Sequence, residues 1–341
     1  MRDIDYKAVR ELLTRKKKIL ITTHTNPDGD AIGSALALYL FFKNRGDYEV
    51  HAMVPNNYPG FLKWLNGSDS IIVFDEKKKL GRSLIKEADV IFSLDYNSFD
   101  RVETFSKEIE EAQAVKILID HHPQPKDYFD FSFSTTETSS TAEMIFDFIV
   151  ELGGLSSIDK AIAENVYTGI VTDTGSFSYL CNYAKTYHAV AELIKKGVDG
   201  ERIHNLIYDN ASENRLRLLG FCLSERLVVL EEYNTAYIYL SQKDMERFNY
   251  QVGDTEGVVN YPLSMGKIHF AALFRERNNK IRISLRSKGN FSVNTFARNH
   301  FYGGGHKNAS GADSFSSLDE TLKKFESVLP QYKEDLKRSM D

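Results

Sequence analysis

Five short apolar runs, rich in β-branched residues, recur in the first third of the sequence. Three of these runs are continuously apolar, which is typical of strands buried on both faces of a sheet. A helical pattern at residues 31–44 lies between the first two runs, as in a βαβ unit with parallel strands. The sequence therefore predicts an α/β fold with a doubly wound, mainly parallel sheet. The predicted strands are residues 18–23, 48–54, 70–74, 89–94 and 115–119.

A helical period replaces the strand pattern from Thr138 to Gly197, where residues 141–152, 161–171 and 186–196 form three candidate helices. Charged and apolar residues then alternate at helical spacing over residues 201–219, which predicts a helix connecting two domains. The predicted limits are residues 1–195 for the first domain, 196–222 for the linker helix and 223–341 for the second domain.

The second domain begins with hairpin-like segments. Residues 226–231 and 236–240 form one predicted pair of strands, and residues 268–275 and 280–286 form another. A cluster of three glycines follows, and residues 317–329 have the pattern of a final helix. We therefore expect a second, smaller mixed α/β domain.

Length, charge and cysteine content limit the class of protein. A chain of 341 residues is long enough for about two domains, each with its own core. The net charge of −5 has the wrong sign for a protein that holds long duplex nucleic acid through many phosphates, so we expect no such partner. Two cysteines form no disulfide framework, and the sequence shows neither a signal peptide nor a membrane-length apolar run. A cytoplasmic protein without a membrane partner is expected.

Acidic and histidine residues follow three of the predicted strands directly. Because ligands bind at the carboxyl ends of parallel strands, the three clusters are expected to meet at one crevice. Oxygen and imidazole ligands without a thiolate suit Mn²⁺ or Mg²⁺. The sequence therefore predicts a metal site. Its candidate residues are His24, Asp28 and Asp30 after the first strand, Asp95 after the fourth, and Asp120, His121 and His122 after the fifth.

Each cluster taken alone also has a simpler interpretation. Asp-Gly and Asn-Pro are ordinary turn signals, and an acid before a helix is an ordinary N-cap. It is the coincidence of three clusters that favours a metal site. A fourth acid, Asp173, follows an apolar helical segment, where its charge opposes the helix dipole, and this placement suggests a bound cation.

The motifs HTNPDGDAIGS, SLDYN, LIDHHP and TGIVTDTGSFSY resemble, in this order, the four motifs of the DHH phosphoesterase superfamily. The segment GGGHKNASG at 303–311 resembles the signature of its DHHA1 domain, and the whole chain is most similar to the NrnA-type subfamily. The resemblance implies two Mn²⁺ ions, with Mg²⁺ as the alternative. It implies His24, Asp28 and Asp95 as ligands of the first ion, and Asp30, Asp95, His121 and Asp173 as ligands of the second, so that Asp95 bridges.

Two cations that share a carboxylate can activate a water molecule and hold the phosphoryl oxygens, which agrees with this assignment. We expect Asp95, Asp120, His121 and His122 to be catalytic. Asp120 is expected to orient His121, because a metal-bound imidazole usually needs such a partner. The family likeness makes His122 a contact of the substrate phosphate, although a structural histidine is the alternative.

Basic residues concentrate in the second domain, where residues 255–310 carry nine Lys or Arg and two Glu, a local charge of +7. Three consecutive glycines can expose backbone N–H groups as an anion nest. Arg286 is a candidate grip on a substrate phosphate because its guanidinium matches phosphate bidentately. The other expected substrate-binding residues are His122, Arg298, Gly303, Gly304, Gly305, His306 and Ser310.

The resemblance implies an enzyme that hydrolyses short single-stranded oligoribonucleotides to 5′-mononucleotides, in the manner of a 3′–5′ exonuclease. It also implies removal of the 3′-phosphate of 3′-phosphoadenosine 5′-phosphate (pAp). Hydrolysis of cyclic dinucleotides or of linear pApA is the enzymatic alternative, and a nucleotide-binding regulatory protein is the non-enzymatic one. A pyrophosphatase and a RecJ-like processive exonuclease are disfavoured. A homodimer is left open.

Overall fold

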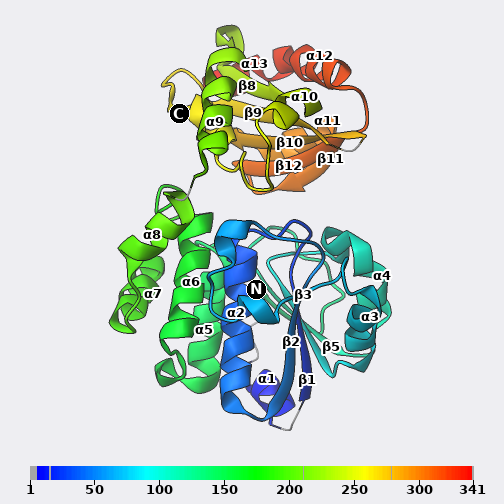
Figure 1. Ribbon diagram of the computed structural model, residues 1–341, viewed down its shortest axis with the longest axis vertical. Helices are drawn as coiled ribbons and strands as arrows, with labels where there is room; N and C mark the ends of the chain where they lie inside the picture. The colour runs from blue at the N-terminus through cyan, green and yellow to red at the C-terminus, as the bar shows by residue number, and fades with distance from the viewer. Residues whose placement is uncertain (1–5, 15–16, 210, 278, 340–341) are drawn as a thin grey trace. The chain divides into compact units, whose positions relative to one another are not determined.

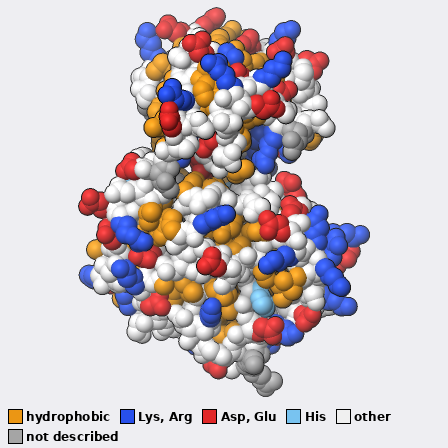
Figure 2. Space-filling model, in the orientation of Figure 1, with side chains coloured by type: hydrophobic (Ala, Val, Ile, Leu, Met, Phe, Trp, Pro, Cys, Tyr) orange, Lys and Arg blue, Asp and Glu red, His pale blue; other side chains and the backbone are white. Residues whose placement is uncertain are grey.

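The computed structural model describes residues 6–14, 17–209, 211–277 and 279–339. The chain divides into two units, an N-terminal unit (Met1–Asn210) and a C-terminal unit (Ala211–Asp341), and each has its own hydrophobic cores. In the described part of the chain, no helix has both the length and the apolar character needed to cross a bilayer. On the face drawn in Figure 2, side chains of both charges are interspersed over each unit.

A six-stranded sheet forms the centre of the N-terminal unit (Figure 1). Its strands run in the order β3-β2-β1-β4-β5-β6, and all neighbouring pairs are parallel, so the doubly wound α/β prediction is confirmed. The strands are β1 (Lys17–Thr22), β2 (Tyr48–Val54), β3 (Ile72–Val73), β4 (Val90–Leu94), β5 (Val115–Asp120) and β6 (Phe131–Ser134).

Helices cover both faces of this sheet because side chains alternate along each strand. Ile19 and Ile21 of β1 pack with α2, α5 and α6, whereas Leu20 packs on the opposite face with α3 and α4. The helices of this unit are α1 (Tyr6–Leu12), α2 (Gly29–Arg45), α3 (Lys78–Glu87), α4 (Ser106–Glu111), α5 (Thr141–Gly153), α6 (Lys160–Asp173), α7 (Ala184–Lys195) and α8 (Gly200–Tyr208).

The C-terminal unit contains a second six-stranded sheet, in the order β11-β12-β10-β9-β8-β7. Among the described residues of this unit, only β8 and β9 pair in parallel, so the unit has the mixed α/β character that the sequence predicts. Its elements are α9 (Glu213–Glu225), β7 (Leu227–Leu230), β8 (Thr235–Leu240), α10 (Gln242–Arg247), β9 (Phe270–Arg277), β10 (Lys280–Ser287), α11 (Val293–His300), β11 (Tyr302–Gly305), β12 (Ala309–Ser314), α12 (Leu318–Val328) and α13 (Lys333–Lys337).

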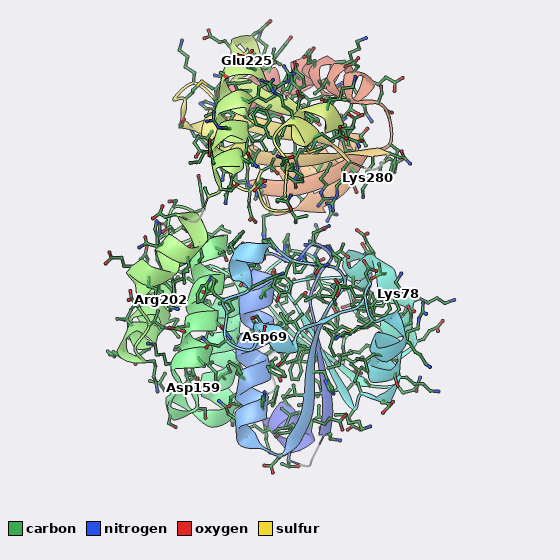
Figure 3. The ribbon with its side chains drawn as sticks, viewed as in Figure 1. Asp69, Lys78, Asp159, Arg202, Glu225 and Lys280 are labelled. Carbon is green, nitrogen blue, oxygen red and sulfur yellow. The ribbon has the colours of Figure 1, made fainter. Side chains whose placement is uncertain are left out.

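The single linker helix predicted within residues 196–222 is wrong. Two helices occupy this region: α8 belongs to the N-terminal unit and α9 to the C-terminal unit. Arg202, labelled on α8 in Figure 3, lies 3.4 Å from the buried carboxylate of Glu164 on α6. Ser212 starts α9 by accepting a hydrogen bond from the backbone N–H of Arg215. The sequence pattern runs through both helices because both are amphipathic, and the N-cap at Ser212 separates them.

In the N-terminal unit, the sequence analysis missed one strand and made another too long. The edge strand β6 has only four residues, too few to give a clear alternating pattern. The predicted strand at 70–74 keeps only Ile72 and Val73 as β3, because Ser68–Ser70 forms a 3₁₀ turn.

Candidate metal and phosphate site

Three loops converge at the carboxyl edge of the parallel sheet. Strands β1, β4 and β5 are neighbours in the sheet, and one of the predicted clusters lies at the carboxyl end of each. The predicted convergence of these clusters is confirmed, because their side chains lie within a few ångströms of one another. All of their His and Asp residues are buried except Asp28, whose side chain is 47% exposed.

The first group of potential metal ligands contains His24, Asp28 and Asp95, whose ligand atoms all lie within 4.8 Å of one another. His24 Nε2 is 3.3 Å from Asp95 Oδ2 and 4.0 Å from Asp28 Oδ1. The other ring nitrogen, Nδ1, lies 3.0 Å from the carbonyl oxygen of Thr25 and donates to it. This hydrogen bond leaves Nε2 directed at the carboxylates and available to a cation.

The second group contains Asp30, Asp95 and His121, again within 4.8 Å. His121 Nε2 lies 3.5 Å from Asp95 Oδ1 and 3.8 Å from Asp30 Oδ2. It also lies 3.5 Å from Asp173 Oδ2, so the last residue of α6 joins this group. The structure thus brings together all the residues for which the sequence predicts metal binding.

Asp95 belongs to both groups and divides its two oxygens between them. Oδ2 faces His24, and Oδ1 faces His121. The residue has a φ of 63°, in the left-handed region that non-glycine residues seldom adopt, and its backbone N–H donates to Ile119. Such a backbone is retained where the surrounding structure holds it, often at a functional site. The hydroxyl of Thr141 donates to Asp95 Oδ1 at 2.9 Å.

The titration behaviour of the cluster reflects an excess of negative charge. Burial, followed by the charges of Asp95 and Asp173, raises the pKa of Asp30 well above its usual value. Burial acts against ionisation of Asp95 too, but hydrogen bonds from His121 and His24 hold the pKa of Asp95 well below its usual value. Burial lowers the pKa of His24 and His121, but the neighbouring carboxylates raise it, and the net shift of both pKa values is upward. The raised pKa values of Asp30, His24 and His121 favour bound protons, which offset the negative charge of the cluster as a bound cation can.

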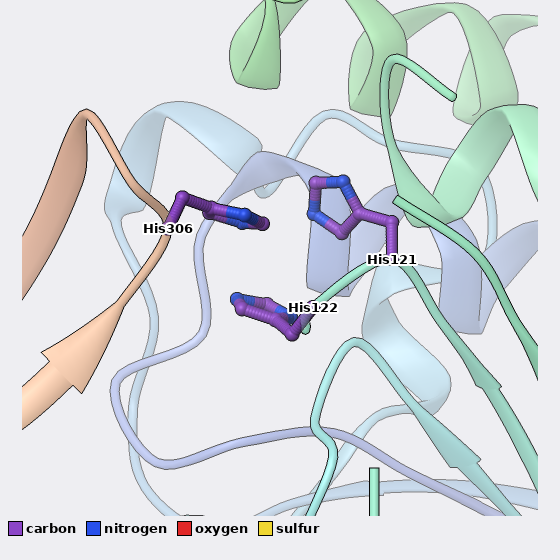
Figure 4. Close-up of side chains that lie close together, drawn as sticks. All are labelled: His121, His122 and His306. Carbon is purple, nitrogen blue, oxygen red and sulfur yellow. The ribbon is translucent and has the colours of Figure 1, made fainter. Parts of the chain in front are cut away.

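The predicted orientation of His121 by Asp120 is wrong. Asp120 accepts two hydrogen bonds from His122 instead: Nδ1 of His122 lies 2.7 Å from Oδ1, and its backbone N–H lies 3.1 Å from Oδ2. The two histidine rings project from the loop after β5 with centroids 5.0 Å apart and planes at 71° (Figure 4). Consecutive side chains diverge along an extended chain, so Asp120 meets the second residue after it and not the first.

The turn-and-cap interpretation holds for part of the site. Asp28 is the N-cap of α2, and its Oδ1 accepts hydrogen bonds from the N–H groups of Asp30 and Ala31. A capping carboxylate still has a second oxygen and further lone pairs, so capping and metal binding are compatible in one residue. Asp173 ends α6, as predicted, and its charge lies at the unfavourable end of that helix dipole.

The three glycines of the C-terminal unit form a strand and not the predicted anion nest. Gly303, Gly304 and Gly305 lie in β11, which pairs antiparallel with β12 at the edge of the sheet. A Cβ at Gly303 would lie 2.2 Å from the carbonyl oxygen of Gly311. Glycine is required there because the strands approach closely. The guanidinium of Arg298 lies beside Gly304.

The remaining predicted phosphate contacts lie near one turn of this sheet. Arg286 on β10 is paired with Ala309 on β12, one residue before Ser310. The hydroxyl of Ser310 donates to the carbonyl oxygen of His306 at 2.9 Å, and the N–H of His306 donates to Ala309. Ser310 is buried, and its hydrogen bond holds the turn that carries His306.

Not all of the positive charge in this unit is available to a ligand. Lys280 and Arg282 both pair with Asp313, at 2.8 and 3.2 Å. The alternation predicted for β10 is confirmed, since Ile281, Ile283 and Leu285 are buried and the residues between them are less so.

Sequence reasoning missed Thr141 and Glu143 near the metal-binding cluster. Both are fully buried at the start of α5, and Glu143 Oε2 accepts hydrogen bonds from Ser139 and Thr186. The sequence marks this place only as a helix start, because a Ser/Thr-rich segment before a helix is ordinary capping chemistry.

Both units of the chain match models of known protein families. The model of the DHH family N-terminal domain matches residues 18–170, and that of the DHHA1 domain matches residues 233–331. A bifunctional oligoribonuclease and PAP phosphatase NrnA from Thermus thermophilus is 30% identical over 322 residues, which cover 94% of this chain and 91% of that protein.

Solved structures agree with this match. An exopolyphosphatase-related protein from Bacteroides fragilis is 42% identical, with a TM-score of 0.92 over 98% of this chain and 97% of its own. RecJ from Thermus thermophilus, solved in complex with Mn²⁺, has the same fold at 14% identity, with a TM-score of 0.56 over 97% of this chain and 54% of its own. By its motifs, its two domains and these relatives, the chain belongs to the DHH family and carries a DHHA1 domain.

Proposed function

We propose that the chain is a Mn²⁺-dependent phosphoesterase that hydrolyses short oligoribonucleotides to 5′-mononucleotides and removes the 3′-phosphate of pAp. One observation carries the proposal: Asp95 lies between two groups of metal-ligand residues and offers one oxygen to each. The name of the Thermus relative, an oligoribonuclease and PAP phosphatase, supports the choice of substrates.

The donor set fits a pair of hard divalent cations. It consists of carboxylate oxygens and imidazole nitrogens without sulfur, which suits Mn²⁺ or Mg²⁺. We assign one ion to His24, Asp28 and Asp95, and the second to Asp30, Asp95, His121 and Asp173. When bound, such a pair acts as a Lewis acid on phosphoryl oxygens and lowers the pKa of a water molecule. RecJ, which shares the fold, was solved with Mn²⁺.

The residues around the cluster orient the reactants. Asp120 accepts the Nδ1 proton of His122 and so fixes the plane of that ring. We assign Asp120 to the orientation of His122, and the family likeness supports the assignment of His122 to the substrate phosphate. Burial of these groups strengthens their interactions with a phosphoryl group, because the local dielectric constant is low.

We assign the recognition of a further substrate phosphate to the DHHA1 unit. Arg286 and Arg298 supply the positive charge of the proposed surface, whereas Lys280 and Arg282 share Asp313. Gly303, Gly304 and Gly305 on the edge strand and His306 on the following turn complete the proposed binding surface, and Ser310 supports it by holding the turn.

The test is a panel of substrates with purified protein and Mn²⁺: pAp, pApA, a cyclic dinucleotide, inorganic polyphosphate, and RNA from dinucleotides to long chains. We expect mononucleotide release from the shortest RNA and phosphate release from pAp. Preference for the cyclic dinucleotide or for polyphosphate would replace the proposed substrates but keep the chemistry. Nucleotide binding without turnover of any of these substrates would refute the enzyme and favour a regulatory protein.

A further inference from the structure

The N-terminus of α5 makes three hydrogen bonds to two buried acids of the cluster, Asp30 and Asp95. The N–H of Thr141 donates to Asp30 Oδ2 and the N–H of Ala142 to Asp30 Oδ1, both at 2.8 Å. The third bond is the one from the Thr141 hydroxyl to Asp95 Oδ1 at 2.9 Å. We propose that Thr141 is a positioning residue that sets the rotation of the Asp95 carboxylate, so that each of its oxygens serves one metal ion.

The need for such a residue follows from the geometry of Asp95. The terminal torsion of an aspartate is broad, so the backbone alone does not fix the plane of its carboxylate. In this structure Oδ2 is 3.3 Å from His24 Nε2 and Oδ1 is 3.5 Å from His121 Nε2. A rotation of the carboxylate would turn both oxygens away from their histidines together. The Thr141 hydroxyl approaches Oδ1 and opposes this rotation.

Thr141 is itself held in place. Its side chain is fully buried, and its β-branch restricts its rotamer. Ser140 caps α5 by accepting a hydrogen bond from the N–H of Glu143. Glu143 in turn accepts hydrogen bonds from the N–H and the hydroxyl of Ser139, at 3.0 and 2.5 Å, and from the hydroxyl of Thr186 on α7 at 2.6 Å. The start of α5 is thus a rigid support for the hydroxyl.

The consequence is an effect on metal binding that is separate from any contact with substrate. Groups that orient metal ligands from outside the coordination sphere typically change metal affinity or activity by about 10–100-fold when they are removed. Because Asp95 is assigned to both ions, loss of the Thr141 hydroxyl is expected to weaken the binding of both. This inference rests on the proposed two-metal site.

The experiment compares the variants T141V and T141S with the wild-type protein by calorimetric titration with Mn²⁺ and by electron paramagnetic resonance of the Mn²⁺-loaded protein. Val keeps the shape of Thr and loses the hydroxyl, whereas Ser keeps the hydroxyl and loses the methyl group. The matched control is T168V, since Thr168 is equally buried but donates its hydroxyl to the carbonyl oxygen of Glu164 within α6. T141A replaces T141V if circular dichroism shows that T141V is unfolded.

We expect Mn²⁺ affinity to fall about 10–100-fold in T141V and the spectrum of a coupled Mn²⁺ pair to be lost at metal concentrations that saturate the wild type. T141S and T168V should bind as the wild type does. Wild-type affinity in T141V overturns the inference, and so does a T141S variant as weak as T141V, since the methyl group would then be what matters. A wild-type protein that binds no second Mn²⁺ ion overturns the two-metal site and the inference with it.

Discussion

Replacing Asp95 with Asn tests whether one carboxylate serves two cations. Asn keeps the size of the side chain, and its amide oxygen can still accept the hydrogen bond that the Thr141 hydroxyl gives to Asp95 Oδ1. What the change removes is the negative charge and the second acceptor that faces His24. The matched comparison is Asp28→Asn, which changes only the first group of ligands and keeps the N-cap of α2, because Asn is as good an N-cap as Asp.

The expected magnitude follows from mass action. A cation present at about one hundred times its dissociation constant stabilises the folded protein by about 2.7 kcal/mol. For a unit the size of the DHH domain, each kcal/mol corresponds to roughly 2–4 °C in melting temperature, so one ion contributes about 5–11 °C and two ions about twice that. We expect Asp28→Asn to lose about half of the Mn²⁺-induced shift and Asp95→Asn to lose nearly all of it.

The assay is thermal unfolding with and without Mn²⁺, combined with the rate of phosphate release from pAp. In Asp95→Asn we expect the rate to fall by several orders of magnitude, because a cation that stabilises charge in the transition state contributes several kcal/mol and each 1.36 kcal/mol is about tenfold. If Asp95→Asn and Asp28→Asn lose the same part of the thermal shift, Asp95 is not shared and the assignment is refuted.

Three further predictions concern other parts of the structure. Without metal ions, the free energy of unfolding should fall as the pH rises above about 6.5. The reason is that His24 and His121 have folded-state pKa values above those of the unfolded chain and stabilise the fold only while protonated. Urea titrations at several pH values measure this free energy, and a value that does not change with pH contradicts the prediction. Asp120→Ala removes the acceptor of the His122 Nδ1 proton and should lower kcat about 10–100-fold by freeing the ring of His122 while leaving Mn²⁺ affinity unchanged, and a parallel loss of affinity would speak against this role of Asp120. Gly303→Ala should destabilise the C-terminal unit by about 1–3 kcal/mol, because its Cβ meets backbone of the neighbouring strand, and urea unfolding measures the change.

The control for the glycine prediction is Gly304→Ala. A Cβ at Gly304 would meet only the end of the Arg298 side chain, at 3.5 Å, which is ordinary contact distance. We expect a smaller loss of stability than in Gly303→Ala. Equal losses in the two variants would mean that the general cost of replacing glycine in β11, and not the close approach of β12, sets the stability.

Much of the N-terminal unit could be predicted because its signals are local. Buried parallel strands need continuous apolar runs, and the helix over residues 31–44 of the sequence needs a helical period, so both are written in consecutive residues. The same holds for the acids after β1, β4 and β5, since parallel strands necessarily direct their carboxyl ends to one edge. The convergence of His24, Asp95 and His121 could therefore be predicted from the sequence, and the structure brings their side chains together.

Errors arose where one local pattern is compatible with two structures. An amphipathic period continues across two successive helices as well as along one, and only the packing of α8 against α6 assigns the first helix to the N-terminal unit. Consecutive glycines suit an exposed nest and a tightly packed strand equally well. The structure shows the strand, in which the carbonyl oxygen of Gly311 on β12 lies so close to Gly303 that a Cβ does not fit.

The sequence by itself thus determined the parallel sheet, the acids and histidines at its edge and the two-domain division, because these depend on the order and period of neighbouring residues. The tertiary structure alone decided that Asp120 holds His122, that Thr141 reaches Asp95 and that Asp95 faces both groups of ligands. Thr141 lies 46 residues from Asp95 along the chain. A contact of this kind depends on side-chain direction and on the packing of α5 against the sheet, and no sequence pattern encodes either at that separation.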